Sequence, residues 1–403
     1  MKMKIAVALV ASLLLVTTSP SRSADSASAN DTARFLAGLQ PSAESPLAPL
    51  ADKSWQQHAS QLNAAFDKVE KQQLSKIRTW TSETLTSNRP TMLYFFSGPD
   101  FLYANAFFPK ATTYVLAALE PVGEIPDLMK LPRGSVVPAL GPLRHSMNTI
   151  LAVSFFITKN MQTELRSGKL TGALPVLYVF LARSGKTISD VSLVNLDANG
   201  ELRMGDGVKE KSLARGAKIV FAGSDGRTQT LYYFSTDISN GGFNKTGFAK
   251  FAETLGPADS FIKSASYLLH GNNFSQARDF LIERSALILE DDSGIPFAHF
   301  DQKKWVVRPF GRYIGPLGIF PGTNQPKLRD LYQKGNTAQI PFGVGYRWRP
   351  TETNLLLAIK DPDAASKQEA PKQEAPKQEA PKQDAPKQKT SKQKTPKRES
   401  PKQ

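Results

Sequence analysis

The chain contains no cysteine, so it can form neither a disulfide nor a lipid-modified cysteine behind an export signal. It has only four histidines in 403 residues, and none is spaced from another as metal ligands are. It also lacks Gly-x-Ser-x-Gly and His-Glu-x-x-His. These absences exclude the disulfide-stapled exported domains and the common signatures of serine hydrolases and zinc proteases.

Long apolar runs are scarce as well, and the longest lies at the N-terminus. Lys2 and Lys4 precede the apolar run 5–16, and a stretch rich in Ser, Pro and Ala follows, as in a secretory signal. Such a run is too short for the roughly 20 residues that cross a bilayer, as is the run 148–157. We therefore expect a signal peptide over residues 1–29, cleaved near 21–23 or 27–29, and a periplasmic or extracellular bacterial protein without a transmembrane segment.

The C-terminal segment has no aromatic or branched apolar residue. From Ser366 it repeats Lys-Gln-Glu-Ala-Pro and then becomes Lys-rich, so it cannot bury enough surface to offset the entropy of ordering. We predict a disordered tail over residues 363–403. From Ser366 on, it holds eleven Lys or Arg and five acids, a net +6 of the formal +15.

The basic balance therefore resides largely in the two ends of the chain. A pI of 9.7 is then poor support for nucleic-acid binding, and no motif of interleaved basic and aromatic residues occurs. We expect no specific nucleic-acid partner. The tail is instead expected to act either as a solvated spacer or as a loose, salt-sensitive contact with an anionic envelope polymer or membrane surface.

Between the ends we expect a Pro/Ser/Ala-rich linker over 30–50 and a globular region over 51–362, as one domain or two packed halves. Periodicity predicts an α+β fold with a mixed, largely antiparallel sheet and helices packed on it. Asp52 is expected to cap a helix whose apolar spacing slips near Leu74. Further helices are expected over 136–166, 246–254, 258–269 and 275–284.

Short apolar runs bounded by turn residues predict the strands. They cover residues 91–97, 111–120, 174–182, 188–197, 201–204, 218–223, 227–235, 286–291, 304–310, 343–348 and 354–360. Asp225-Gly226 is expected to close a hairpin in an antiparallel meander.

Three short patterns resemble known motifs but fail on context. Ser260-x-x-Lys263 and Lys245-Thr246-Gly247 resemble motifs of penicillin-binding proteins and serine β-lactamases, yet their order is reversed and they lie too close together. Residues 182–187 end like a phosphate-binding loop, but Phe180 stands where that loop needs its first glycine. Residues 197–201 fit a hairpin turn better than a calcium loop.

Two stretches remain as candidate sites, each with a purely structural alternative. In 92–109, Asp100 follows an expected strand and either caps the next helix or serves as a catalytic carboxylate. In 289–300, acidic residues follow another strand and form either a polar turn or a site. The catalytic candidates are Asp100, Asp291, Asp292 and His299, and the ligand-binding candidates are Tyr103 and His270. No metal site and no cofactor are expected.

Two function classes follow from these features. The first is an exported binding or structural protein of the envelope with a flexible basic tail, favoured by the missing nucleophile motifs. The second is an exported hydrolase that uses carboxylates around Asp100 and around Asp291 and Asp292. The second class requires these carboxylates to converge on one substrate.

Overall fold

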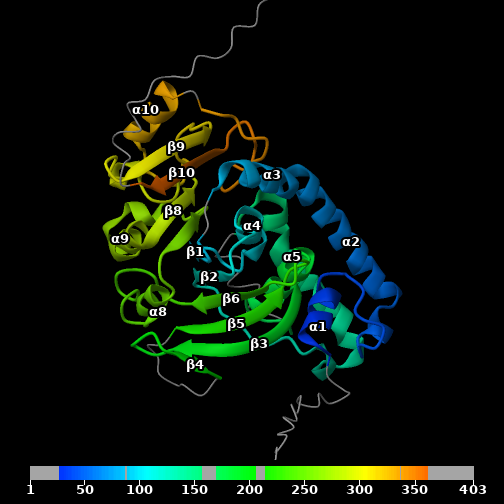
Figure 1. Ribbon diagram of the computed structural model, residues 1–403. Helices are drawn as coiled ribbons and strands as arrows, with labels where there is room; N and C mark the ends of the chain where they lie inside the picture. Colours follow the sequence, from blue (N-terminus) through cyan, green and yellow to red (C-terminus); the bar gives the residue numbers. More distant parts are fainter. Residues whose placement is uncertain (1–26, 87–88, 157–168, 206–213, 336, 362–403) are drawn as a thin grey trace, which may run out of the picture.

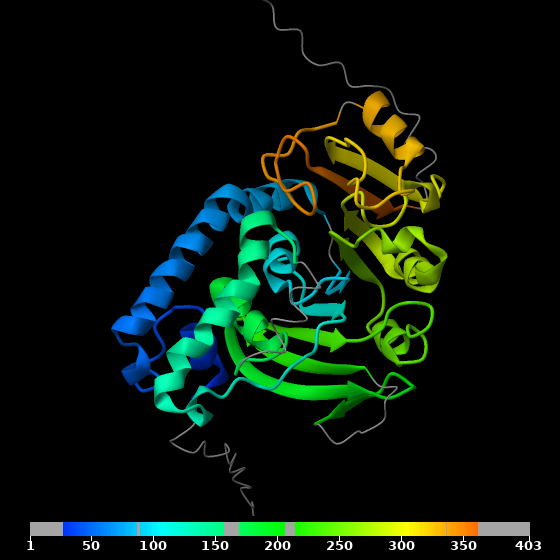
Figure 2. The same cartoon turned by 180° about the vertical axis from the view of Figure 1, so that it is seen from behind.

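The computed structural model describes residues 27–86, 89–156, 169–205, 214–335 and 337–361. Within them, ten strands form one mixed sheet in the order β4-β3-β5-β6-β2-β1-β7-β8-β10-β9, with helices on both faces (Figures 1 and 2). This confirms the predicted α+β class and mixed sheet. Residues 1–26 of the expected signal and the expected tail lie outside the described residues.

The centre of the sheet is parallel, in the order β6-β2-β1-β7-β8. Its strands are β1 Thr91–Phe95, β2 Thr113–Ala118, β6 Thr228–Ser235, β7 Ala258–Ile262 and β8 Ser285–Glu290. β1 and β7 are buried along their whole length. Burial on both faces explains the apolar run of β1, whereas β7 carries the buried polar residues Asp259 and Ser260. The expectation of a largely antiparallel sheet therefore holds for the flanks and is wrong for the centre.

An antiparallel group of strands flanks each side of this centre. On one side lie β3 Thr187–Leu196, β4 Leu202–Met204 and β5 Arg215–Ala222, and on the other β9 Trp305–Gly311 and β10 Asn354–Lys360. The β5–β6 hairpin closes at Asp225-Gly226, as predicted, with Gly226 at φ 72°. β10 lies between β8 and β9 and pairs with both.

Helices cover the two faces of the sheet as separate layers. One layer contains α1 Ala29–Leu36, α2 Lys53–Val69, α3 Ser75–Thr84, α4 Phe101–Phe107, α5 Val136–Val153 and α7 Leu174–Arg183. The other contains α8 Phe248–Thr254 and α9 Ser275–Arg284. Alternate residues of β1 divide between them: Met92 and Tyr94 pack with the first layer, and Leu93 and Phe95 with the second. Figure 1 shows the two layers on opposite sides of β1.

The first long helix confirms the predicted cap and explains the slip in its apolar spacing. Asp52 Oδ1 accepts hydrogen bonds from the N–H groups of Ser54 and Trp55, at 2.9 and 3.0 Å. A π-helical turn, Glu70–Leu74, separates α2 from α3. Such a turn inserts one residue into the helical repeat, so the apolar step lengthens where the sequence slips.

Residues 174–182, expected to form a strand, are the helix α7. Every residue from Leu174 to Leu181 except Pro175 is fully excluded from solvent. A helix that is buried on all sides shows no 3.6-residue period, and it cannot be distinguished by pattern from a buried strand. Pro175 lies in the first turn, where its missing N–H costs nothing.

The opposite error occurs at 258–269, which was expected to be helical. Residues 258–262 form the strand β7, and the turn after it departs from helical geometry at Ser264, Ser266 and Tyr267. Residues 343–348, expected to be a strand, contribute only an isolated bridge between Val344 and Arg347.

Two other segments depart from expectation in smaller ways. The segment 30–50, expected to be a linker, contributes α1 and the buried residues Phe35, Leu36 and Leu47 to the core. α5 continues through Pro142 as one helix and ends at Val153, and residues 157–166 of the helix expected over 136–166 lie outside the described residues. Short α10, Pro326–Lys334, packs its Leu328 on Leu356 of β10.

Candidate functional site

The chain leaves the neighbouring parallel strands β1 and β7 in opposite directions. After β1 it crosses one face of the sheet through α4 to β2, and after β7 it crosses the other face through α9 to β8. In open α/β sheets, such a divergence leaves a crevice at the carboxyl ends of the two strands, where ligands commonly bind. The carboxyl ends of β1 and β7 are therefore the place where this fold favours a site.

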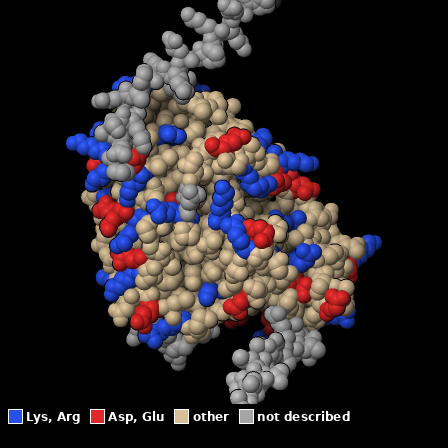
Figure 3. All heavy atoms as spheres, in the orientation of Figure 1, with Lys and Arg blue, Asp and Glu red and all other residues tan. Residues whose placement is uncertain are grey.

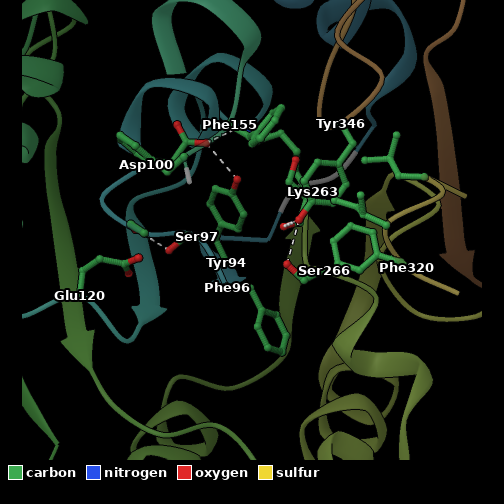
Figure 4. A pocket seen from close by; sticks show the side chains of 15 residues that line it. Tyr94, Phe96, Ser97, Asp100, Glu120, Phe155, Lys263, Ser266, Phe320 and Tyr346 are labelled. Atoms are coloured by element: carbon green, nitrogen blue, oxygen red, sulfur yellow. Dashed lines mark hydrogen bonds and ion pairs between the residues drawn. The ribbon is translucent and has the colours of Figure 1, made fainter. Parts of the chain in front are cut away.

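A cavity of about 400 Å³ lies at this position (Figure 4). The end of β1 and its turn contribute Tyr94, Phe96, Ser97, Gly98 and Asp100, and Glu120 follows β2. The residues after β7 contribute Lys263, Ser264 and Ser266. The remaining wall is apolar and aromatic, and consists of Phe155, Phe156, Leu317, Ile319, Phe320 and Tyr346. Both the volume and this mixture of a large apolar wall with a few polar groups suit a small molecule.

Asp100 caps a helix and also lies at the floor of the cavity. Its Oδ1 accepts the N–H of Tyr103 at 3.1 Å, which makes it the N-cap of α4. Its Oδ2 accepts the hydroxyl of Tyr94 at 2.9 Å and lies 2.8 Å from Lys263 Nζ. The side chain is 1% exposed and both oxygens are engaged, so the capping alternative is confirmed.

Lys263 is the buried cation that joins these groups. Besides Asp100, its Nζ donates to the backbone carbonyl of Ser154 at the end of α5 and lies 4.1 Å from the ring centre of Tyr103. Burial lowers the pKa of Lys263, while Asp100 and Asp291 act to raise it. Tyr103, the second residue predicted here, thus contributes a ring face to the lysine.

Asp291 approaches the same lysine from the end of β8. Its Oδ2 accepts the N–H of Ser264 at 3.0 Å, and its Oδ1 accepts both the N–H and the hydroxyl of Ser293. Gly345 lies against both groups: a Cβ there would meet Asp291 Oδ2 at 2.0 Å and Lys263 Cγ at 3.4 Å. Burial and the neighbouring Asp292 raise the pKa of Asp291. Asp100 and Asp291 therefore both act on the same lysine side chain, and their convergence on one substrate stays a prediction.

The other predicted site residues lie outside the cavity. Asp292 Oδ2 accepts the hydroxyl of Tyr267 at 2.7 Å, and its Oδ1 accepts the amide of Asn354 at 3.0 Å. His270 packs edge-on against Tyr267, and burial lowers its pKa to about 4. His299 ends a short helical turn, Phe297–His299. Of the six candidate residues, Asp100 lines the cavity, Tyr103 and Asp291 adjoin it through Lys263, and Asp292, His270 and His299 are not among its lining residues. The functional role of all six stays a prediction.

Backbone strain is concentrated around the cavity. Of the described non-glycine residues, five have positive φ: Phe96, Ser154, Ser264, Ser266 and Tyr267, at 51–67°. Three of them line the cavity, and the other two contact residues that do, through Lys263 and through Phe320 and Tyr346. Each such conformation costs on the order of 1 kcal/mol and persists only where the surroundings enforce it, commonly at functional sites.

The aromatic wall is built by segments far apart in sequence. The ring of Tyr346 lies 5.0 Å from that of Phe155 and 5.5 Å from that of Phe320. The Tyr346 hydroxyl donates to the carbonyl of Ser264 at 3.0 Å and lies 2.8 Å from Ser266 Oγ. Because its single hydrogen goes to Ser264, Ser266 must donate to Tyr346. Tyr346 thus ties the C-terminal loop to the turn after β7.

The rejected Ser-x-x-Lys pattern contains one site residue but no serine nucleophile. Ser260 is fully buried and exchanges a 2.7 Å hydrogen bond with Ser285, so it does not line the cavity. Lys263 was missed because its segment was assigned to a helix. A strand ending at Ile262 would have placed Lys263 at the carboxyl edge, beside Asp100.

The described residues contain no group of three or more His, Cys, Asp or Glu that could hold a metal ion. Among the described helices, none is long and apolar enough to cross a membrane. No protein-family model matches the chain. No curated protein and no solved structure gives a significant match to it either.

Proposed function

We propose that this chain is an exported small-molecule-binding protein whose ligand occupies the cavity between the carboxyl ends of β1 and β7. The observation that carries the proposal is the coincidence of the cavity, the divergence of the chain and the strained residues at one position. Strain maintained in turns from three parts of the sequence is consistent with a preformed pocket.

Binding is favoured over catalysis because the charged groups at the base of the cavity already have hydrogen-bonding or ionic partners within the protein. Asp100 uses both oxygens, and Lys263 is occupied by Asp100, Ser154 and the Tyr103 ring. Asp291 is likewise engaged by Ser264 and Ser293. A general acid or base needs hydrogen-bond reach to its substrate, and these groups have little capacity left for one.

The test uses a substitution that obstructs the cavity and leaves Asp100, Lys263 and Asp291 in place. Leu317 lies on a surface loop and lines the cavity, so Leu317→Trp should obstruct it. Ile314, on the same loop and 42% exposed, does not line it, and Ile314→Trp is the matched control. Both variants and the native chain would be screened against a collection of small apolar and aromatic compounds by thermal shift and native mass spectrometry.

A ligand at about 100 times its Kd stabilises the folded state by about 2.7 kcal/mol. We expect hits that raise the Tm of the native chain and of Ile314→Trp but not that of Leu317→Trp. Hits that stabilise all three proteins equally, or no hits with the native chain, would contradict binding in this cavity.

An exported hydrolase is the second candidate, supported by the convergence of Asp100 and Asp291 on Lys263. It predicts that the native chain releases soluble products from an isolated bacterial envelope fraction, detected by mass spectrometry. Asp100→Asn keeps the size and the capping oxygen of the side chain, and should abolish product release. Equal release by the native chain and Asp100→Asn would refute a role for this carboxylate.

Export is part of the proposal, and α1 restricts where the signal can be cut. Ser28 Oγ accepts the N–H of Asp31 at 2.9 Å and so caps α1, whose buried face packs on α7. Cleavage after Ala29 would remove this cap and place a positive charge at a helix N-terminus, which is unfavourable. Cleavage near residues 21–23 keeps the Ser28 cap and places the new N-terminal charge away from α1. N-terminal sequencing of the secreted protein distinguishes the two cleavage sites.

A further inference from the structure

We infer that the loop 312–325, between β9 and α10, carries a lid at its tip, residues 316–321, which closes over a ligand in the cavity by burying Ile319. The inference rests on the small-molecule-binding function proposed above and adds the movement that encloses the ligand. Four features of the loop lead to it: its exposed tip, its fixed ends, its glycines and the contacts of Arg347.

The tip of the loop places an exposed apolar side chain at the edge of the cavity. Leu317, Ile319 and Phe320 all line the cavity, yet Ile319 is 76% exposed, the highest value among the large apolar residues of the described chain. A side chain that borders the cavity and also faces water marks the opening. A ligand in the cavity would give Ile319 an apolar surface to pack on, and the removal of its surface from water would stabilise the closed position.

Both ends of the loop are fixed to the rest of the protein. At the first end, the N–H of Arg312 donates to the carbonyl of Thr353 at 2.7 Å. At the second end, the side-chain amide of Gln325 donates to the carbonyl of Asp292 at 3.0 Å and accepts the N–H of Phe297 at 2.8 Å. Fixed ends confine movement to the residues between them, as a hinged lid requires.

Glycines with positive φ flank the tip on both sides. Gly315 has φ 96° and Gly322 has φ 78°. A Cβ at Gly322 would meet no described atom within 4 Å, and a Cβ at Gly315 would meet Arg329 Nη2 at 3.9 Å, an ordinary contact. The backbone conformation, and not a lack of space, therefore requires glycine at these two positions. They are placed to absorb the change in φ and ψ when the tip moves.

Arg347 supports the first of these hinges from outside the loop. Its Nη2 donates to the carbonyls of Gly315 and Pro316, at 2.9 and 3.3 Å. Its Nε is buried and has no hydrogen-bond partner in the described structure. A buried donor without a partner is costly, so another arrangement of the loop that satisfies it would be more favourable at this position. Arg347 thus positions the base of the tip in an arrangement that can still improve when the tip moves.

A single introduced thiol can report on the tip, because the native chain has no cysteine. Ile319→Cys places the thiol on the tip. Ile314→Cys, at a residue that is 42% exposed, precedes the first hinge and does not line the cavity, is the matched control. Alkylation of each thiol would be followed by mass spectrometry with and without saturating indole, a flat, uncharged probe. We expect indole to slow alkylation of Ile319→Cys at least about tenfold, as a closed state favoured by about 1.4 kcal/mol gives, and that of Ile314→Cys less than about twofold.

A second variant separates closure of the lid from simple contact between the ligand and the thiol. Arg347 does not line the cavity, so Arg347→Gln acts on bound indole only through the loop. It should raise the dissociation rate of indole about tenfold and leave the association rate nearly unchanged, because it weakens the closed state alone. Arg349→Gln, at an exposed arginine two residues further on, should change neither rate.

The outcomes separate the lid from the function on which it rests. Indole binding that Leu317→Trp abolishes, with unchanged alkylation of Ile319→Cys, would overturn the lid and leave the proposed function standing. Equal protection of both thiols would also overturn it, and unchanged dissociation from Arg347→Gln would overturn the role of this arginine. If indole does not bind, the strongest hit of the compound collection takes its place in the same measurements. If no compound binds in the cavity, both proposals fail.

Discussion

Asp100 and Lys263 form an ion pair in which each partner is almost completely withdrawn from water. Burial of two charges is costly, and the contacts with Tyr94, Tyr103 and the Ser154 carbonyl compensate for it. Removal of one partner leaves the other charge uncompensated. The pair thus fixes the relative positions of β1, β7 and the end of α5, which together form the cavity.

We predict that Lys263→Met lowers the free energy of unfolding by about 3–5 kcal/mol, because it leaves Asp100 charged and buried. Asp100→Asn should cost a similar amount by leaving the lysine unpaired. The double variant Asp100→Asn, Lys263→Met should cost clearly less than the sum, since no isolated charge remains. Urea unfolding of the four proteins measures this coupling, and additive losses would contradict it.

His58 is held neutral by geometry as well as by burial. Its Nε2 lies 3.0 Å from the carbonyl of Leu36 and must carry the hydrogen, because a carbonyl only accepts. Nδ1 is therefore the acceptor for Arg144 Nη1 at 3.1 Å, and a second proton would set two donors against each other. Burial lowers the pKa of His58 to about 4.

This lowered pKa predicts a loss of stability in acid. The folded state resists a proton that the unfolded chain binds near pH 6.5, so the contribution is complete above pH 6.5 and is lost as the pH falls toward 4. The loss amounts to about 3 kcal/mol at most, at 1.36 kcal/mol per pKa unit. His58→Gln should unfold with a smaller stability difference between pH 7 and pH 4 than the native chain. His145→Gln, at an exposed histidine of α5, should show the same stability difference as the native chain. Equal stability differences between pH 7 and pH 4 for all three proteins would refute the role of His58 in the acid sensitivity.

At the scale of single elements, prediction from sequence succeeded where cap residues, turn residues or a clear apolar period mark the ends of the segment. The Asp52 cap, the Asp225-Gly226 turn, α9 and β10 all carry such signals and match the structure. It failed at α7 and β7, which are buried on every side: α7 is apolar all round, and β7 carries Asp259 and Ser260 inside the core. Hydrophobic periodicity depends on a solvent-exposed face, and these two elements have none.

The π-helical turn between α2 and α3 makes an unusual prediction about deletions. Removal of the exposed Gln72 converts its wide turn into an ordinary one and keeps Leu74, Ile77 and Trp80 in register with Val69. Removal of the exposed Gln61, within regular α2, rotates Leu62 and Phe66 out of the core. We expect the Gln72 deletion to lower the Tm much less than the Gln61 deletion. A larger loss for Gln72 would show that the π turn itself is required.

At the scale of the whole molecule, the sequence identified part of the site and missed its assembly. Of the candidates chosen because they follow apolar strands, Asp100 lines the cavity, and Tyr103 and Asp291 adjoin its Lys263. Lys263, Phe320 and Tyr346 became site residues only through the strand order, which brings segments more than 200 residues apart in sequence together around Tyr94. Strand order depends on long-range pairing, and a single sequence carries no local signal for it.

The charge of the folded body and that of the tail can be tested separately for a contribution to surface binding. Lys and Arg are interspersed with Asp and Glu over the face seen in Figure 3. We predict that removal of residues 362–403 leaves the Tm unchanged but abolishes salt-sensitive adsorption to anionic polysaccharide or anionic vesicles. A full-length control with the tail's Lys and Arg replaced by Gln should behave like the truncated chain. Unchanged adsorption by either variant would make the tail a spacer.

The position of β10 in the sheet determines how late in folding the sheet can be completed. β10 is the last described strand, yet it lies between β8 and β9, and Asn354 at its start binds Asp292 in the turn after β8. β9 joins the sheet through β10, so during synthesis it cannot take its place until β10 has emerged. Tyr346, only eight residues before β10, closes the cavity. A chain that emerges N-terminus first therefore completes the cavity in one of the last steps of its folding, and any ligand of the cavity can bind only after nearly the whole described chain has been synthesised.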